Sequence, residues 1–218
     1  MLCLKKGPGL PIVFLHGFLG TSSDWEPVCS FLPDCHCIGI DLPGHGKSPF
    51  TKTFDFDIEK CHLIGYSMGG RLAMGYAAKY PERIASLTVI AGHPGLISPE
   101  EKRLRLEADA RWAKLLFELP IDEFLIRWYD QPLFSTFKPD FSMRRQQNIP
   151  HLAAALMHYS LGNQMRYNPK DVQFIVGEKD EKFRVLYKEP IVIPGASHAV
   201  FLENPKATAL AIERRIYL

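Results

Sequence analysis

Short apolar segments alternate with longer amphipathic segments along most of the chain. The apolar segments have the length of buried strands, and the longer segments have the spacing of helices. Strands that alternate with helices are typical of a parallel sheet covered by helices. Strands are predicted at residues 11–15, 35–40, 62–65, 86–91, 172–176 and 191–193. Helices are predicted at residues 69–80 and 205–216, with a short helix starting at Asp24 and containing Trp25, Val28 and Leu32.

The pattern changes between residues 98 and 165, where no strand-like segment occurs. Helix-like segments fill this stretch at residues 100–119, 121–128 and 151–161. A helical insertion inside an α/β pattern is typical of a cap or lid over a site. We therefore expect an α/β core of residues 1–97 and 166–218, with an all-helical lid at residues 98–165.

The strongest chemical signal is Gly65-Tyr66-Ser67-Met68-Gly69, a G-x-S-x-G sequence between a predicted strand and a predicted helix. In such a nucleophile elbow the strand turns so sharply into the helix that larger side chains would clash, and the serine hydroxyl stands above the sheet. The Met68 N–H then lies at a helix N-terminus, where it can stabilise a developing oxyanion. A chance Gly-Ser-Gly turn is the alternative, and the flanking strand and helix argue against it.

A serine of this kind needs an acid and a histidine later in the chain, in the order serine, acid, histidine. Asp180 and His198 each follow a predicted strand, so both are expected at the carboxyl edge of the sheet, where sites of open α/β sheets form. Glu178 is a competing acid, but it lies closer to its strand. The sequence therefore predicts a Ser67, Asp180 and His198 triad.

The loop after the first strand, His16-Gly17-Phe18, matches the element that supplies a second oxyanion donor. The Phe18 N–H is the candidate donor, and His16 is expected to brace the loop. A second glycine-rich stretch ends in Gly46-Lys47-Ser48 and resembles a phosphate-binding loop. That motif requires glycine where this chain has Asp41, so nucleotide binding is rejected.

Composition and charge exclude several classes of function. The chain is 46% apolar and 23% charged, and its 26 basic and 24 acidic residues leave a net charge of +2, too small to indicate a nucleic-acid partner. No apolar run approaches about 18 residues, so no membrane span is expected. The five cysteines are odd in number and lack a C-x-x-C pair, which indicates a reducing cytoplasm rather than a disulfide framework. Cys35-His36-Cys37 is expected in a buried strand, and no metal is expected.

These motifs together resemble the α/β-hydrolase superfamily. The likeness is closer to the MenH family, which forms 2-succinyl-6-hydroxy-2,4-cyclohexadiene-1-carboxylate in menaquinone biosynthesis. The resemblance implies a lyase that eliminates pyruvate from 2-succinyl-5-enolpyruvyl-6-hydroxy-3-cyclohexene-1-carboxylate without a cofactor. In such an enzyme Ser67, deprotonated by His198, acts as a general base on a ring C–H. The segments that carry the closer likeness are residues 69–74, 105–112, 128–129, 131–134 and 177–184.

The MenH resemblance also implies which residues bind the substrate, a small polycarboxylate. Arginine binds carboxylates bidentately, so Arg71, Arg105 and Arg144 are expected to bind them, and Arg105 and Arg144 match family positions on the lid that face the site. Arg71 lies one turn after the elbow serine, where the helix dipole adds to its charge; a surface arginine paired with a lid acid is the alternative. Either Arg144 or its neighbour Arg145 could be the arginine that faces the site. Tyr66 and Trp128 match residues that line the pocket.

The chain departs from the family at residues 49–60, where the family has a loop and a full helix. A parallel crossover needs about a dozen residues, so the strands can still be connected, but part of one sheet face is expected to lie bare. Either the chain is truncated there or the sequence lacks residues. The segment of residues 183–190 is also short, which leaves little room for a helix between Asp180 and His198.

Two further readings of the function remain open beside the lyase. A serine carboxylesterase or thioesterase could use the same triad, and a non-catalytic binding module could share the fold. The intact triad argues against the module, and the arginine positions favour the lyase over the esterase. The expected partner is the small-molecule substrate, and the chain could be a monomer or a homodimer.

Overall fold

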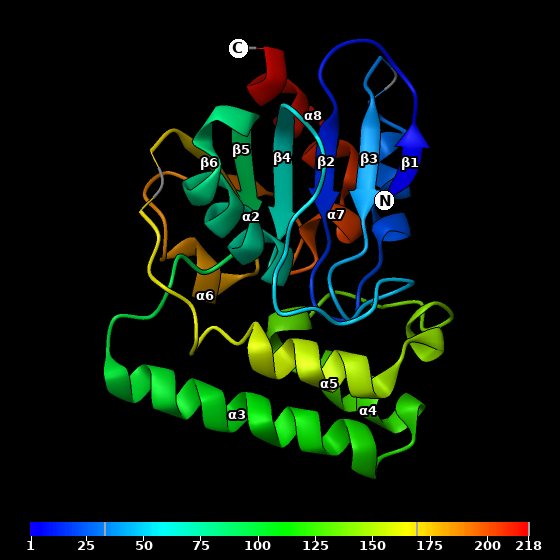
Figure 1. Ribbon diagram of the computed structural model, residues 1–218, viewed down its shortest axis with the longest axis vertical. Coiled ribbons are helices and arrows are strands. Elements are labelled where there is room, and N and C mark those ends of the chain that lie inside the picture. The colour runs from blue at the N-terminus through cyan, green and yellow to red at the C-terminus, as the bar shows by residue number, and fades with distance from the viewer. Residues whose placement is uncertain (33, 169, 218) are drawn as a thin grey trace.

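The fold is built on one twisted sheet, seen in the computed structural model, which describes residues 1–32, 34–168 and 170–217. Seven strands lie in the order β1-β3-β2-β4-β5-β6-β7 (Figure 1). All neighbouring pairs are parallel except β1 and β3. This mostly parallel sheet agrees with the predicted fold class. The strands are β1 Leu2–Lys5, β2 Ile12–Leu15, β3 Cys37–Ile40, β4 Cys61–Tyr66, β5 Ile84–Ile90, β6 Val172–Gly177 and β7 Ile191–Ile193.

Helices cover both faces of the sheet, because successive strand residues point to opposite sides. In β2, Val13 and Leu15 pack in one hydrophobic cluster with α2, while Ile12 and Phe14 pack in the other with α1, α7 and α8. All four side chains are buried, as expected for a central parallel strand. The helices of the core are α1 Glu26–Cys29, α2 Met68–Lys79, α6 Glu181–Arg184, α7 Val200–Glu203 and α8 Pro205–Tyr217.

Three further helices lie between β5 and β6 in the sequence and stand together beyond the carboxyl ends of the parallel strands (Figure 1). They are α3 Pro99–Glu118, α4 Ile121–Tyr129 and α5 Ile149–His158. The Ser98 side chain caps α3 by accepting from the backbone of Glu100 and Glu101, so the helical segment begins there. We propose that residues 98–165 form a lid over a core of residues 1–97 and 166–218.

The structure differs from the sequence prediction near the N-terminus. β1 was not predicted, because Lys5 interrupts a very short apolar run, and the strand pairs antiparallel at the edge of the sheet. The short helix expected from Asp24 is wrong in detail: a 3₁₀ turn at Ser22–Trp25 is followed by the four-residue α1, and Leu32 lies beyond both. Asp24 instead accepts from the Thr21 N–H, three residues before it.

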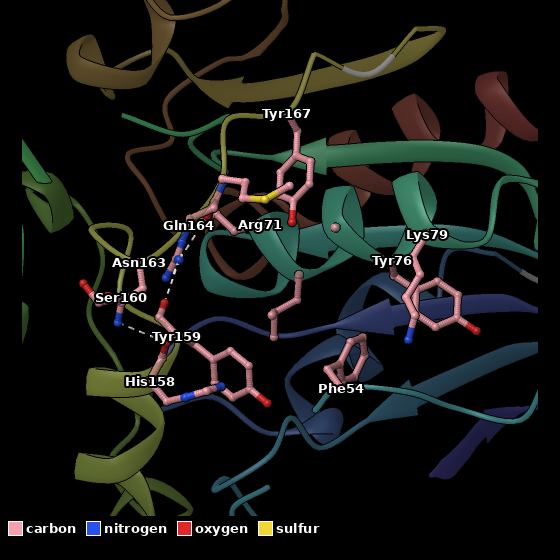
Figure 2. A pocket seen from close by; sticks show the side chains of 13 residues that line it. Phe54, Arg71, Tyr76, Lys79, His158, Tyr159, Ser160, Asn163, Gln164 and Tyr167 are labelled. Carbon is pink, nitrogen blue, oxygen red and sulfur yellow. Dashed lines mark hydrogen bonds between the residues drawn. The ribbon is translucent and has the colours of Figure 1, made fainter. Parts of the chain in front are cut away.

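The short crossover between β3 and β4 contains no helix at residues 49–60, all of which the structure describes. Its aromatic side chains pack on α2 instead. The Phe56 ring stacks on the Tyr76 ring with centroids 4.2 Å apart, and Phe54 packs beside both. The face expected to be bare is therefore partly covered. An open groove of about 280 Å³ remains between α2 and the chain that follows α5 (Figure 2).

The close approach of α2 to β2 makes a testable prediction. A Cβ on Gly69 would lie 2.4 Å from the His16 carbonyl oxygen and 2.5 Å from that of Leu15, so backbone must move. We expect Gly69→Ala to lower the free energy of unfolding by about 1–3 kcal/mol in urea denaturation. Gly75→Ala, on the same helix, meets only the flexible Tyr167 hydroxyl at 2.8 Å and should cost much less. Equal losses in the two variants would contradict this account.

Candidate active site

Ser67 stands at the turn from β4 into α2. Its backbone has φ 50° and ψ −110°, a strained conformation for a residue with a side chain. The Ser67 N–H donates to the Ile90 carbonyl at 2.8 Å, which ties the turn to β5. A Cβ on Gly65 would lie 2.4 Å from the Gly69 carbonyl oxygen, so the strand and the helix leave no room for one. The two glycines of the G-x-S-x-G sequence are therefore required by contact, while the strained conformation belongs to Ser67 itself.

The three predicted triad side chains meet at the carboxyl edge of the sheet. His198 Nε2 lies 3.0 Å from Ser67 Oγ, and His198 Nδ1 lies 2.7 Å from Asp180 Oδ2. The imidazole and the carboxylate are each 2% exposed, so water does not compete for this pair. Because Nδ1–H donates to the carboxylate, Nε2 is left to accept the serine proton. The arrangement can generate a basic serine oxygen.

Glu178, the competing acid, lies elsewhere. Its side chain is exposed, and its Oε2 accepts from the Gly195 N–H at 2.8 Å. Gly195 begins the turn that carries His198, so Glu178 helps to fix that turn. Asp180 is the acid that contacts the imidazole.

The loop after β2 lies beside the serine. His16 is fully buried; its Nδ1–H donates to the Gly17 carbonyl at 2.7 Å, and its Nε2 accepts from the Leu42 N–H at 2.9 Å. Burial lowers the pKa of His16, so the ring is a neutral brace between two loops. Phe18 and Met68 both line the cavity that contains Ser67, and we propose their N–H groups as the oxyanion donors.

The cavity at the triad has a volume of about 300 Å³ and lies between the core and the helices α3 to α5. A cavity of about 410 Å³ lies beside α2 and β5, but no triad residue lines it. The smaller cavity is therefore the candidate active site. Its apolar wall includes Trp112, Trp128, Phe134 and Leu156, and its charged or titratable lining comprises His93, Arg71, Arg105, Asp109, Lys182 and His198.

Arg71 is buried, with 9% of its surface exposed, and lines this cavity. Its guanidinium donates to the Tyr159 carbonyl at 2.7 Å and to Gln164 Oε1 at 3.2 Å (Figure 2). Both acceptors are neutral, which differs from the alternative of a surface arginine paired with a lid acid. Burial, and then the nearby Arg105, lower the pKa of Arg71 to about 9. Among the described residues, no carboxylate forms an ion pair with this charge.

The other two arginines have carboxylate partners. Arg105 Nε donates to Asp109 Oδ2 at 2.9 Å on the same helix, and both side chains line the cavity. Arg144 is buried in a small adjoining cavity that Ser67 also lines, and its guanidinium lies 3.2 Å from Asp24. Arg145 lies on the surface, paired with an exposed aspartate. Of these two neighbours, Arg144 is therefore the one that faces the serine.

Tyr66 and Trp128 also reach the serine. The Tyr66 ring packs 5.2 Å from the His198 ring, and the Trp128 ring packs 4.9 Å from that of Phe18. Both side chains line the small cavity that contains Ser67 and Arg144.

Sequence reasoning missed three titratable residues of the cavity lining, His93, Lys182 and Asp109, the partner of Arg105. Lys182 lies two residues after Asp180, inside the segment that carries the MenH resemblance, and that proximity could have identified it. His93 follows β5, and its Nδ1 accepts from the Gly95 N–H at 3.0 Å. Burial, and then the charges of Lys182 and Arg71, lower the pKa of His93 to about 4, so the ring is neutral.

The structure gives three further findings about the described residues. No group of three or more His, Cys, Asp and Glu side chains among them could hold a metal ion. Cys35 and Cys37 are buried, and β3 begins at Cys37, two residues later than predicted. None of the described helices is long and apolar enough to span a membrane.

Comparisons with known structures agree with this geometry. MenH from S. aureus superposes with a TM-score of 0.82 at 25% sequence identity, covering 95% of this chain and 93% of that one. A thermophilic esterase from Thermogutta terrifontis has a TM-score of 0.74 at 23% identity, covering 97% and 90%. At that identity the esterase shows the shared fold alone.

Comparisons with known sequences are more specific. The 2-succinyl-6-hydroxy-2,4-cyclohexadiene-1-carboxylate synthase of Enterobacter sp. (strain 638) is 35% identical over 241 positions, covering 97% of this chain and 93% of the relative. The synthase of Escherichia coli O1:K1 / APEC is 36% identical over 228 positions, covering 91% and 90%. The alignment with the first relative has 241 positions, 23 more than the 218 residues of this chain. This chain therefore has gaps in that alignment, which is consistent with its short crossover.

A family model for the alpha/beta hydrolase fold matches residues 11–199, which is most of the chain. Together with the two synthases, this match confirms the resemblance that the motifs indicated. The chain belongs to the α/β-hydrolase superfamily and, within it, to the family of the 2-succinyl-6-hydroxy-2,4-cyclohexadiene-1-carboxylate synthases.

Proposed function

We propose that this chain is a lyase of menaquinone biosynthesis. It eliminates pyruvate from 2-succinyl-5-enolpyruvyl-6-hydroxy-3-cyclohexene-1-carboxylate and forms 2-succinyl-6-hydroxy-2,4-cyclohexadiene-1-carboxylate. The observation that carries the proposal is the cavity itself: a hydrogen-bonded serine, histidine and aspartate open into a space that also contains Arg71 and Arg105. The substrate's three carboxylates need such cations, and its elimination needs such a base.

The reaction follows from the hydrogen bonds of the triad. His198 Nε2 takes the proton of Ser67 Oγ, and the serine oxygen removes a proton from the ring carbon. The ring C–O bond to the enolpyruvyl group then breaks as the new ring double bond forms. The leaving group departs as the enolate of pyruvate and takes up a proton. Asp180 stabilises the imidazolium that exists between these proton transfers.

Charge that builds on the substrate during proton removal needs hydrogen-bond donors close to the serine. We assign this role to the N–H groups of Phe18 and Met68, whose residues line the cavity beside Ser67. Tyr66, Trp128 and Arg144 would contact the substrate from the adjoining small cavity. No acyl-enzyme forms in this scheme, because the serine removes a proton and attacks no carbonyl.

A serine carboxylesterase or thioesterase is the second candidate function. The same triad could attack an ester carbonyl, and the Ser67 hydroxyl is accessible in the cavity. A neutral ester would leave the buried charge of Arg71 without a counter-charge, whereas a polycarboxylate would neutralise it. This difference favours the lyase.

We also propose a cytoplasmic location and a small-molecule partner. All five cysteines are free, and four of them are buried. Free thiols are typical of a reducing compartment.

Ser67 and His198 should act as one unit. We expect Ser67→Ala and His198→Ala each to lower the turnover number for pyruvate release on the order of a thousandfold, and the double variant to lose little more. The measurement is steady-state pyruvate release from the purified substrate. Losses that multiply in the double variant would rule out this coupling.

Arg105 should distinguish the lyase from the esterase. Removing it takes away a charge-assisted hydrogen bond worth about 1.5–3 kcal/mol, so we expect Arg105→Ala to lower kcat/KM for the polycarboxylate roughly ten- to a hundredfold. Hydrolysis of a neutral nitrophenyl ester should barely change.

Two controls accompany the Arg105 measurement. Arg103→Ala removes an exposed arginine of the same helix, paired with Glu100 and Glu107, and should change neither activity. Arg105→Ala combined with Asp109→Asn avoids leaving a buried carboxylate unpaired. If both activities fall in parallel in the single and the double variant, Arg105 is structural and the lyase proposal loses this support.

A further inference from the structure

Lys182 is a charged residue of the active-site cavity to which the proposed mechanism gives no role. It is the second residue of α6, directly after the turn that carries Asp180. Asp180 Oδ1 accepts from the Phe183 N–H at 3.3 Å, so the acid of the triad also fixes the start of this helix. The position of Lys182 is therefore tied to the triad through the backbone.

The ammonium of Lys182 lies over the ring of Phe183, which contacts the histidine of the triad. The ammonium lies 5.8 Å from the centroid of the Phe183 ring, and that ring lies 4.7 Å from the ring of His198. Lys182 is exposed overall and at the same time lines the cavity, which places it at the mouth. The Lys182 ammonium can therefore contact a ligand as it enters the cavity, and it stays close to that ligand once the ligand is bound.

The positive charge around the cavity exceeds the negative charge available to balance it. Arg105 is paired with Asp109, and Asp180 is engaged by His198. Among the residues that the structure describes, neither Arg71 nor Lys182 forms an ion pair with a carboxylate. Two cations of the cavity therefore lack an ion-pair partner among the described residues, the buried Arg71 and the exposed Lys182 at the mouth.

The cations line one cavity together with His93. Its pKa is lowered to about 4, first by burial and then by Lys182, Arg71 and Arg105, which come from three different elements. Burial and the charge of Arg105 also lower the pKa of Lys182. Cations that repel one another around one cavity are stabilised when an anion enters.

We propose that Lys182 binds a second carboxylate of the substrate at the cavity mouth, while Arg71 binds another carboxylate deep inside. The ligand class is a molecule with at least two carboxylates separated by the length of the cavity. This inference rests on the proposed function and deepens it. It adds a specificity-determining residue, since a monocarboxylate can satisfy only one of the two cations.

The test compares Lys182→Met with Lys179→Met. Lys179 is an exposed lysine of the same loop that does not line the cavity. Titration calorimetry measures the binding of 2-succinylbenzoate, which has two carboxylates, and of benzoate, which has one. We expect Lys182→Met to weaken 2-succinylbenzoate binding roughly three- to tenfold, the size of effect for a partly solvated ion pair, and to leave benzoate binding unchanged. Lys179→Met should change neither, and Lys182→Arg should retain most of the affinity.

Turnover gives an independent reading of the same variants. Lys182→Met should raise KM for the polycarboxylate and leave kcat and neutral-ester hydrolysis nearly unchanged. Equal weakening in the Lys179 and Lys182 variants, unchanged 2-succinylbenzoate binding, or a parallel loss of ester hydrolysis would each overturn the proposal. If the wild-type chain releases no pyruvate, the proposed function fails, and the calorimetric comparison still decides the role of Lys182.

Discussion

The turn at Ser67 is the constraint on which the rest of the site depends. A residue with a side chain adopts φ 50° there because β4 and α2 are pressed together through Gly65 and Gly69, without room for a Cβ. The unfavourable conformation persists because backbone contacts with β2 and a hydrogen bond to β5 hold it from two sides. The turn therefore places the Ser67 hydroxyl at the carboxyl edge of the sheet, where the loops that carry Asp180 and His198 also lie.

Burial then determines how the site uses its charges. The Asp180 and His198 pair is shielded from water, so the imidazole keeps one orientation and one tautomer. The cavity next to it carries positive charge that the described carboxylates do not balance. A buried arginine whose partners are a carbonyl and an amide, as at Arg71, is costly in the empty site. A carboxylate that enters and pairs with Arg71 removes this free-energy penalty, and the binding of carboxylates is strengthened by that amount. The site therefore favours carboxylate ligands.

The short crossover between β3 and β4 covers part of α2 without a helix of its own. Residues 49–60 contain neither helix nor strand, and Phe56 stacks on Tyr76 of α2. Two aromatic rings bury enough apolar area to cover part of the helix, at a lower cost in ordered residues than a whole helix would need. Arg71 lines both the groove that remains open and the cavity of the triad, and Phe54 of the crossover lines the groove as well. The short crossover therefore leaves the elbow intact and forms part of the surroundings of Arg71.

The sequence by itself determined the strand order along the chain, the elbow and the order of the triad. These features depend on local requirements: a sharp turn that tolerates only glycine, the spacing of apolar residues, and loops that must follow parallel strands. The choice of Asp180 over Glu178 also followed from position, since the residue closer to the strand cannot reach the imidazole and instead holds the turn at Gly195. β1 escaped prediction, because a four-residue edge strand with one lysine has too little pattern to recognise.

Only the tertiary structure decided which charges face the cavity. Arg144 and Arg145 are neighbours in sequence, yet one is buried beside Ser67 and the other is paired on the surface, because a short 3₁₀ turn points them in different directions. Arg71 depends on the Tyr159 carbonyl, 88 residues further along the chain, which the packing of α5 brings to it. Whether Lys182 reaches the cavity depends likewise on the start of α6. A local pattern contains no information about such partners, because their positions are set by how the lid helices pack on the sheet.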